Sequence, residues 1–209
     1  MTAALQDSTV QKAEVAGPAA EDVLRANTYA LLATLLRKEP DQNTLRSLAE
    51  LPSDESELGQ ALAALGESAR SRDAESVADE FYALFIGIGE SELKPYGSYY
   101  LTGFMYEKPL AKLRAALADF GIASADGTVE PEDHIAALCE VMCALIMGEF
   151  GTPVALDAQR AFFDTYVGSW APLFFADLEA AESASFYGCV GTIGRLFMRI
   201  EAQAFAMGA

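Results

Sequence analysis

Apolar residues recur at helical spacing near the start of this chain. They are Val23, Leu24, Leu31, Leu32, Leu35 and Leu36, spaced so that they share one side of a helix. Two acids, Glu21 and Asp22, precede the run, where they favour the positive end of the helix dipole, and Pro40 ends it. The pattern therefore predicts a first long helix that begins near Glu21.

Similar apolar stripes predict helices along the rest of the chain. The expected ranges are 43–51, 54–71, 73–85, 107–120, 131–150, 156–167, 170–181 and 185–205, and the aromatic stretch 95–100 is expected to be a loop. Alternation of apolar and polar residues with period two, the sign of a half-buried strand, is not found. We predict an all-α fold: one globular domain of eight to ten helices over residues 21–209, after a flexible N-terminal arm at residues 1–20.

Glycines mark two further features. Gly188, Gly191 and Gly194 lie three residues apart on the last predicted helix, and this spacing predicts the close approach of another helix. Gly87 and Gly89 lack the third glycine and the strand-to-helix context of a dinucleotide-binding fingerprint. The sequence therefore indicates no nucleotide cofactor.

Charge limits the classes of partner. The chain has 31 acidic and 14 basic residues, a net charge of −17, and 52% hydrophobic residues. Such a surface repels phosphate backbones and attracts basic partners, so no nucleic-acid binding is expected. No uncharged stretch reaches the roughly 18 residues of a membrane span, and the first twenty residues lack the pattern of an export signal. We expect a cytoplasmic protein without a membrane span.

Metal binding and catalysis are both disfavoured. Cys139 and Cys143 lie one helical turn apart, and His134 precedes them, but a zinc site needs a second pair of ligands. Because both cysteines fall within an apolar stripe, small core residues are the better interpretation. His134 is the only histidine and has no nucleophile at a meaningful spacing. We therefore predict that the protein is not an enzyme and binds no metal or cofactor.

An aromatic stretch and an acidic stretch remain. The first follows Pro95 and comprises Tyr96, Tyr99, Tyr100, Phe104 and Tyr106. Aromatic residues at this density favour either a small core beneath a loop or a surface for a partner. The acidic stretch runs from Glu130 to His134; its acids suit a helix start, but a cationic histidine does not.

Three motifs in order resemble those of the TorD/DmsD/NarJ family of redox-enzyme maturation chaperones. The first is Phe81-x-x-Leu84-Phe85, the second is the loop Pro95-Tyr96-Gly97-Ser98, and the third is Glu130-Pro131-x-Asp133-His134. The resemblance covers roughly residues 22–205. Tyr96 stands where some members have tryptophan.

This resemblance implies a TorD-like helical bundle that binds the twin-arginine signal peptide of a molybdenum-containing oxidoreductase precursor. It would hold the precursor back from export until the cofactor is loaded. A monomer or a lobe-swapped dimer is compatible with it. The alternative is a helical adaptor or regulator that binds a folded partner without recognising a signal peptide.

The site residues that we expect on this basis fall into two groups. We assign Phe81, Leu84, Phe85, Pro95, Tyr96 and Tyr99 to an apolar groove, with Ser98 beside them. Glu130, Asp133 and His134, together with Pro131, are expected to form a polar rim that faces the paired arginines.

Overall fold

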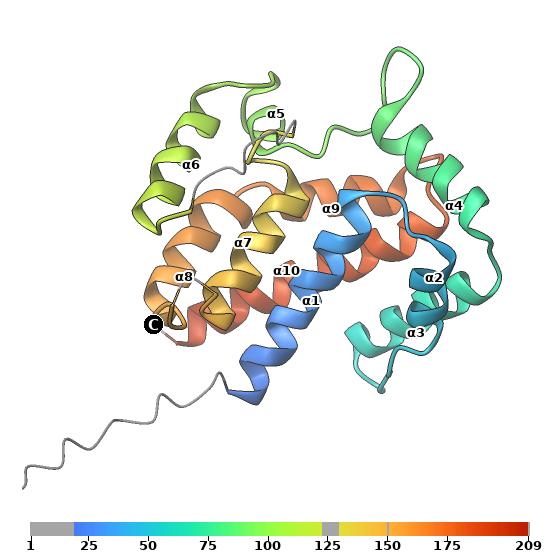
Figure 1. Cartoon of the computed structure of the whole chain (residues 1–209), viewed down its shortest axis with the longest axis horizontal. Helices are drawn as coiled ribbons and strands as arrows, with labels where there is room; N and C mark the ends of the chain where they lie inside the picture. The colour runs from blue at the N-terminus through green and yellow to red at the C-terminus, as the bar shows by residue number, and fades with distance from the viewer. Residues whose placement is uncertain (1–18, 123–129, 150, 209) are drawn as a thin grey trace, which may run out of the picture.

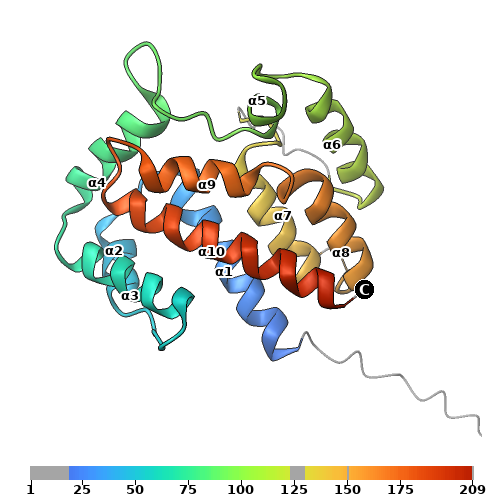
Figure 2. The same ribbon diagram turned by 180° about the vertical axis from the view of Figure 1, so that it is seen from behind.

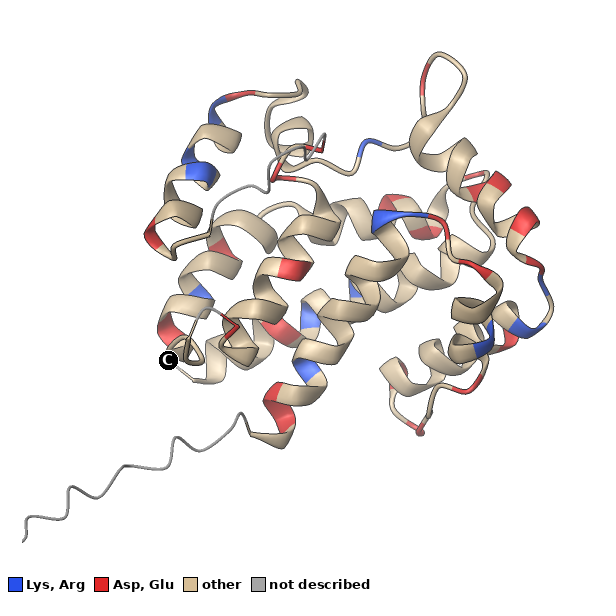
Figure 3. Cartoon of the chain, in the orientation of Figure 1, with Lys and Arg blue, Asp and Glu red and all other residues tan. Residues whose placement is uncertain are grey.

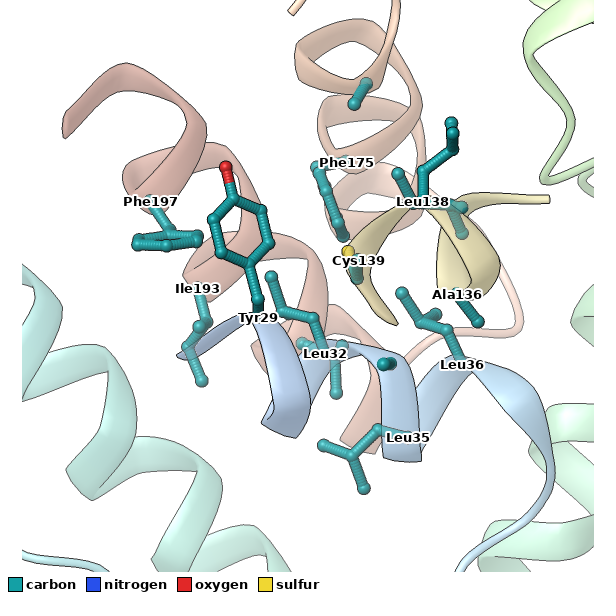
Figure 4. Close-up of a cluster of buried hydrophobic side chains, with 14 of the residues drawn as sticks. Tyr29, Leu32, Leu35, Leu36, Ala136, Leu138, Cys139, Phe175, Ile193 and Phe197 are labelled. Carbon is teal, nitrogen blue, oxygen red and sulfur yellow. The ribbon is translucent and has the colours of Figure 1, made fainter. Parts of the chain in front are cut away.

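The protein folds around four long helices arranged in two layers (Figures 1 and 2). The computed structural model describes residues 19–122, 130–149 and 151–208. Helices α1 (Ala20–Arg37) and α7 (Ile135–Met147) lie side by side on one face. Helices α9 (Ala171–Ala180) and α10 (Phe186–Met207) form the other face. The apolar faces of all four helices meet in the core, which Figure 4 shows at Tyr29, Cys139, Phe175 and Phe197.

The remaining helices flank the central layers. At one end lie α2 (Gln42–Ala49), α3 (Glu57–Arg70) and α4 (Ala74–Phe81), and at the other lie α5 (Gly97–Thr102), α6 (Lys108–Asp119) and α8 (Leu156–Phe162). Two π-helical turns, η1 (Tyr82–Ile86) and η2 (Phe163–Val167), continue α4 and α8. The described residues thus form ten α-helices and no named strand, which confirms the predicted all-α class. None of these helices is long and apolar enough to span a bilayer.

Side-chain caps explain where several helices begin. Asp41, Ser56 and Asp73 each accept a hydrogen bond from a backbone N–H group of the first turn that follows. The cap of α3 is Ser56 and not the earlier Asp54, so this helix begins later than the predicted position. The predicted arm, residues 1–20, lies almost entirely outside the described residues.

Two glycines of α10 allow α9 to approach closely. A Cβ atom on Gly194 would lie 2.1 Å from the Phe175 ring, and one on Gly191 would lie 2.4 Å from the backbone nitrogen of Glu179. At Gly188 the nearest atom would be 3.8 Å away. The predicted close approach is therefore confirmed at two of the three glycines.

Two predictions of local structure are wrong. Residues 97–102 form helix α5 and not a loop, and α7 begins at Ile135 and not at Pro131. Both differences have one cause. The backbone at Tyr96 pairs with the extended backbone at His134 in an antiparallel bridge, which excludes helix there and places Asp133 at the start of α5. Such a contact between distant residues has no local sequence signal.

Candidate functional site

Three hydrogen bonds to the backbone or to Asp133, besides side-chain contacts, join the aromatic stretch to the acidic stretch. Two of them form the antiparallel bridge between Tyr96 and His134, and in one of these the N–H of Ile135 donates to the carbonyl of Pro95 over 2.9 Å. Asp133 accepts twice, from Gly97 N–H at its carbonyl (2.9 Å) and from Ser98 N–H at Oδ2 (2.7 Å). Two motifs that are 35 residues apart therefore form one rigid unit.

His134 is a neutral cap at the centre of this unit. Its side chain is buried, its ring meets that of Tyr96 edge-on at 5.1 Å, and its Nδ1 accepts from Ala136 N–H over 3.1 Å. Burial, and secondarily the charge of Arg37, lower the pKa of His134 to about 3. The imidazole is therefore uncharged at neutral pH. This explains a histidine at a helix start, and it corrects the expectation that His134 belongs to a charged rim.

The acidic residues of the motif differ in how far they are exposed to solvent. Glu130 is exposed and accepts a hydrogen bond from the Tyr96 hydroxyl. Burial, and then this bond, raise the pKa of Tyr96. Glu132 pairs with Arg114 of α6 at 2.9 Å. Asp133, by contrast, is only 3% exposed. Of the two carboxylates predicted for the rim, Glu130 is therefore exposed and Asp133 lies inside the protein.

A cavity of about 330 Å³ opens beside Asp133, between α5, α6 and η2. We call it the Asp133 cavity. Its lining residues are Gly97, Ser98, Leu101, Thr102, Lys108, Pro109, Lys112, Leu113, Asp133, Thr165, Tyr166 and Trp170. Its walls are thus mainly apolar and aromatic, and its few polar groups come from separate elements, as is usual for ligand pockets.

Two buried polar atoms of residues that line this cavity have no hydrogen-bond partner. They are Oδ1 of Asp133 and Oγ of Ser98, and the Ser98 residue is fully buried. Buried polar groups are normally paired, so two unpaired atoms within the wall of one cavity indicate a place where a ligand or water can complete their hydrogen bonds. Gly97 is required here because a Cβ atom would lie 2.9 Å from Nε1 of Trp170.

Exposed apolar side chains occur on α5 and in the residues that follow it, and one of them, Leu101, also lines the cavity. We define the α5 patch as Tyr99, Leu101, Phe104 and Tyr106, which are 36%, 45%, 69% and 70% exposed. Tyr106 has a φ of 62°, a conformation unusual for a bulky residue. An exposed apolar cluster of this kind is typical of an interaction surface.

One tyrosine of the aromatic stretch turns inward. The Tyr100 ring lies 5.5 Å from Trp170 and 5.9 Å from Phe174, and its hydroxyl donates to Asp177 over 2.9 Å. The interpretation as a small core therefore holds for Tyr100, and a partner surface at the exposed residues stays a prediction. Tyr100 extends the core, and the α5 patch faces solvent.

The Phe81 motif belongs to the core and does not line the Asp133 cavity. Phe81 is 8% exposed and Leu84 is fully buried, while Phe85 is half-buried. Phe81 and Phe85 pack against each other and against Tyr187 of α10, with ring centroids 5.0–5.7 Å apart. The sequence predicted that Phe81 and Leu84 form part of an open apolar groove. In the described structure the core covers both side chains, so neither lines an open groove.

Most residues of the cavity lining were missed from the sequence, which assigned only Ser98 and Asp133 to the site. Leu101, Tyr166 and Trp170 line the cavity, yet they come from α5, η2 and the start of α9. Leu101 could have been found as an apolar residue near the aromatic stretch. No pattern in the sequence connects Tyr166 and Trp170 to that stretch.

The cysteines form no metal site or activated nucleophile among the described residues. Cys139 is buried and Cys143 is half-buried, and both are free thiols. Burial raises the pKa of Cys139, which keeps it protonated and unreactive. No group of three His, Cys, Asp or Glu side chains in the described part of the chain could hold a metal ion.

The fold is that of a known class of helical proteins. A crystal structure described as that of a putative redox enzyme maturation protein from Archaeoglobus fulgidus aligns with a TM-score of 0.55 at 21% identity, over 84% of this chain and 94% of that one. Residues 51–176 match the family model described as nitrate reductase delta subunit. The chain therefore belongs to this family, which includes NarJ and TorD, and the resemblance seen in the sequence is confirmed.

Several relatives are named chaperone protein TorD. The protein from Photobacterium profundum is 29% identical over 63% of this chain and 64% of its own length. Those from Aliivibrio fischeri and Vibrio parahaemolyticus are 26% and 25% identical, over 78% and 88% of this chain and 80% and 95% of theirs. The similarity thus extends over most of the fold.

Proposed function

We propose that this chain is a cytoplasmic chaperone that binds the twin-arginine signal peptide of a molybdenum-containing oxidoreductase precursor. It holds the precursor from export until the cofactor is inserted. Relatives named chaperone protein TorD support the chaperone role. The observation that carries peptide binding is the Asp133 cavity, which opens beside the α5 patch and contains a buried, incompletely paired carboxylate.

A twin-arginine signal has a basic head followed by an apolar segment, and the site offers a surface for each. Burial of about 500 Å² of apolar area stabilises a complex by on the order of 12 kcal/mol before costs. Ordering the peptide and losing its free motion remove much of this free energy. An exposed pair such as arginine with Glu130 adds only about 0.2–1 kcal/mol. The α5 patch therefore sets most of the affinity.

The expected site residues take different roles in this proposal. Tyr96, Tyr99 and Glu130 contact the peptide at the surface, and Ser98 and Asp133 act from inside the cavity. Pro95, Pro131 and His134 hold the two stretches together. Phe81, Leu84 and Phe85 support the fold beside α10, and any direct peptide contact by them stays a prediction.

Calorimetry with synthetic twin-arginine leaders tests the apolar contribution. We expect Phe104→Ser and Leu101→Ser each to weaken binding about tenfold or more, because each removes a large apolar contact. Leu24→Ser is the matched control: Leu24 is 68% exposed, and α1 begins at the opposite end of the molecule (Figure 1). Equal affinity of all three variants would contradict the assignment of the α5 patch.

A second titration separates the chaperone from the adaptor. The client precursor is compared with the same enzyme lacking its leader. We expect strong binding only with the leader present, because the proposed contacts are all made to that segment. Equal binding of both forms would favour a helical adaptor that recognises a folded partner.

A further inference from the structure

We propose that the Asp133 cavity is a subsite for a single guanidinium group, so that one arginine of the signal peptide inserts its side chain there. This inference rests on the proposed function and makes it specific. It differs from surface pairing of arginines with an acidic rim, because the residue that carries the carboxylate is only 3% exposed.

The carboxylate of Asp133 is only half satisfied. Oδ2 accepts from Ser98 N–H, while Oδ1 has no partner. None of the ion pairs within the described residues involves Asp133. A buried charge without a cation is costly to maintain, so the site gains most from a ligand that brings a positive charge and an N–H donor.

The lining of the cavity favours a guanidinium group over an ammonium group. Ser98, whose N–H binds the carboxylate, offers its Oγ as a second acceptor, which suits a planar fork of several N–H donors better than a compact ammonium. Tyr166 and Trp170 provide aromatic walls. Guanidinium groups stack on such rings through cation–π attraction and dispersion. The apolar remainder accommodates the methylene stem of the side chain.

Two lysines at the cavity repel a cationic ligand, but this repulsion is weak. Lys108 and Lys112 line it from α6, and both are exposed. Water and salt screen exposed charges, whereas a buried carboxylate keeps much more of its attraction. The buried group therefore determines which charge the cavity accepts. The lysines remain free to meet carbonyl or carboxylate oxygens of the same peptide.

The chain contains a built-in reporter for this site. Trp170 is its only tryptophan and forms one wall of the cavity. A guanidinium group stacked against the indole changes the tryptophan fluorescence directly. Every change in that signal originates from this one side chain.

The test titrates a leader that binds the wild-type protein and compares it with leaders carrying citrulline, the neutral isostere, at each arginine in turn. We expect citrulline at one position to weaken binding about ten- to a hundredfold and to abolish the Trp170 response. Citrulline at the other position has the smaller effect. Losses below twofold at both positions would overturn the inference.

Protein variants locate the effect. Asp133→Asn should bind the arginine and citrulline leaders within about twofold of each other, because the charge is gone. Ser98→Ala removes an unpaired hydroxyl, keeps the fold, and should reduce the discrimination about three- to tenfold. Asp119→Asn, an exposed carboxylate of α6 away from the cavity, is the matched control and should discriminate as the wild type does. Full discrimination by both the Ser98→Ala and the Asp133→Asn proteins would overturn the inference while leaving signal-peptide binding intact.

A third arm separates the two proposals. If no leader binds the wild-type protein, the proposed function fails, and acetyl-Arg-Arg-amide at millimolar concentration then tests the cavity alone. A saturable change in Trp170 fluorescence with this dipeptide, absent with its citrulline counterpart and in Asp133→Asn, would support the subsite. An unchanged signal, as expected if the cavity holds only water, would overturn it.

Discussion

Three carboxylates lie buried among the described residues of this acidic protein, and they differ in what satisfies them. Glu201 accepts from the guanidinium of Arg25 and the hydroxyl of Tyr29. Glu80 accepts from the backbone N–H groups of Ser185, Phe186 and Tyr187 at 2.7–3.1 Å. These two carboxylates are fully engaged in the fold, and Asp133 alone of the three keeps an unused oxygen.

Glu80 connects α4 to the start of α10, and its removal should be costly. We expect Glu80→Ala to lower the free energy of unfolding by about 3 kcal/mol, because three N–H groups near the helix start lose their acceptor. Urea denaturation gives this value. Asp79→Ala, at the exposed neighbouring position, should change stability by less than about 0.5 kcal/mol. A loss below about 1 kcal/mol in Glu80→Ala would show that water replaces the carboxylate.

His134 should make stability depend on pH in a known direction. Its folded pKa of about 3 lies below the unfolded value of 6.5, so below pH 6.5 the unfolded chain binds the proton more readily. Stability therefore falls as the pH falls through this window, by about 1.4 kcal/mol per pH unit.

Comparison with His134→Asn isolates this effect from the titration of carboxylates. Asparagine keeps a cap acceptor and does not titrate. We expect the wild type to lose about 2 kcal/mol more than the variant between about pH 7.5 and about pH 5. Parallel stability curves for the two proteins would mean that the folded imidazole accepts a proton, contrary to its burial.

At the scale of single residues, the sequence singled out Asp133 and His134 but indicated the wrong surroundings for both. Asp133 and His134 were expected on a rim, because acids and a histidine near a helix start are usually solvated. Their burial follows from the pairing of Tyr96 with His134, a contact between residues far apart in the sequence. Only the folded chain reveals it.

At the scale of elements, the packing of α9 against α10 can be tested with two glycines of one helix. Alanine favours helix over glycine by up to about 1 kcal/mol. We expect Gly188→Ala to be neutral or stabilising, since its Cβ has room. Gly194→Ala should instead destabilise by about 1–3 kcal/mol, because its Cβ would overlap the Phe175 ring.

Thermal unfolding of both variants measures the difference. Both substitutions replace glycine by alanine in the same helix, so the gain in helix propensity is similar in both and largely cancels when their stabilities are compared. Any remaining difference reports the space between the helices. Similar melting temperatures would show that α9 can shift away from α10 at little cost.

Most helices were predictable from the sequence, including short ones such as α2 and α8, but α5 was not. The stripes of α1, α6 and α10 gave their positions to within a few residues, because each has several turns of consistent apolar spacing. Helix α5 has six residues and depends on Asp133 for its first hydrogen bonds. The π-helical turns η1 and η2 continue ordinary helices, and no simple periodicity distinguishes them.

At the scale of the whole molecule, acidic side chains are spread over many elements and do not gather at the α5 patch (Figure 3). The net charge of −17 should therefore accelerate the approach of a basic leader from all directions. The predicted acidic rim is thus reduced to the exposed Glu130 within a diffuse field, and its second carboxylate, Asp133, lies inside the protein.

This division predicts how salt affects leader binding. Between about 50 and about 500 mM salt we expect the association rate to fall several-fold, because exposed charges are screened. The dissociation rate should change little, since the contact with Asp133 is buried. Stopped-flow measurements with Trp170 as the probe separate the two rates. A dissociation rate that rises as steeply as the association rate falls would place the arginine outside the cavity.

The junction between residues 95–98 and 133–135 also has a consequence for how such a site diversifies. The chain leaves the bundle at Gly97 and returns at Asp133, and hydrogen bonds close the two ends together. Helices α5 and α6 lie within this excursion and supply one side of the cavity, while Tyr166 and Trp170 on the bundle supply the other. Exchange of the segment between these two ends would reshape the ligand preference. The four central helices keep their packing if the new segment retains the core contacts that Tyr100 of α5 and Leu113 and Leu117 of α6 make.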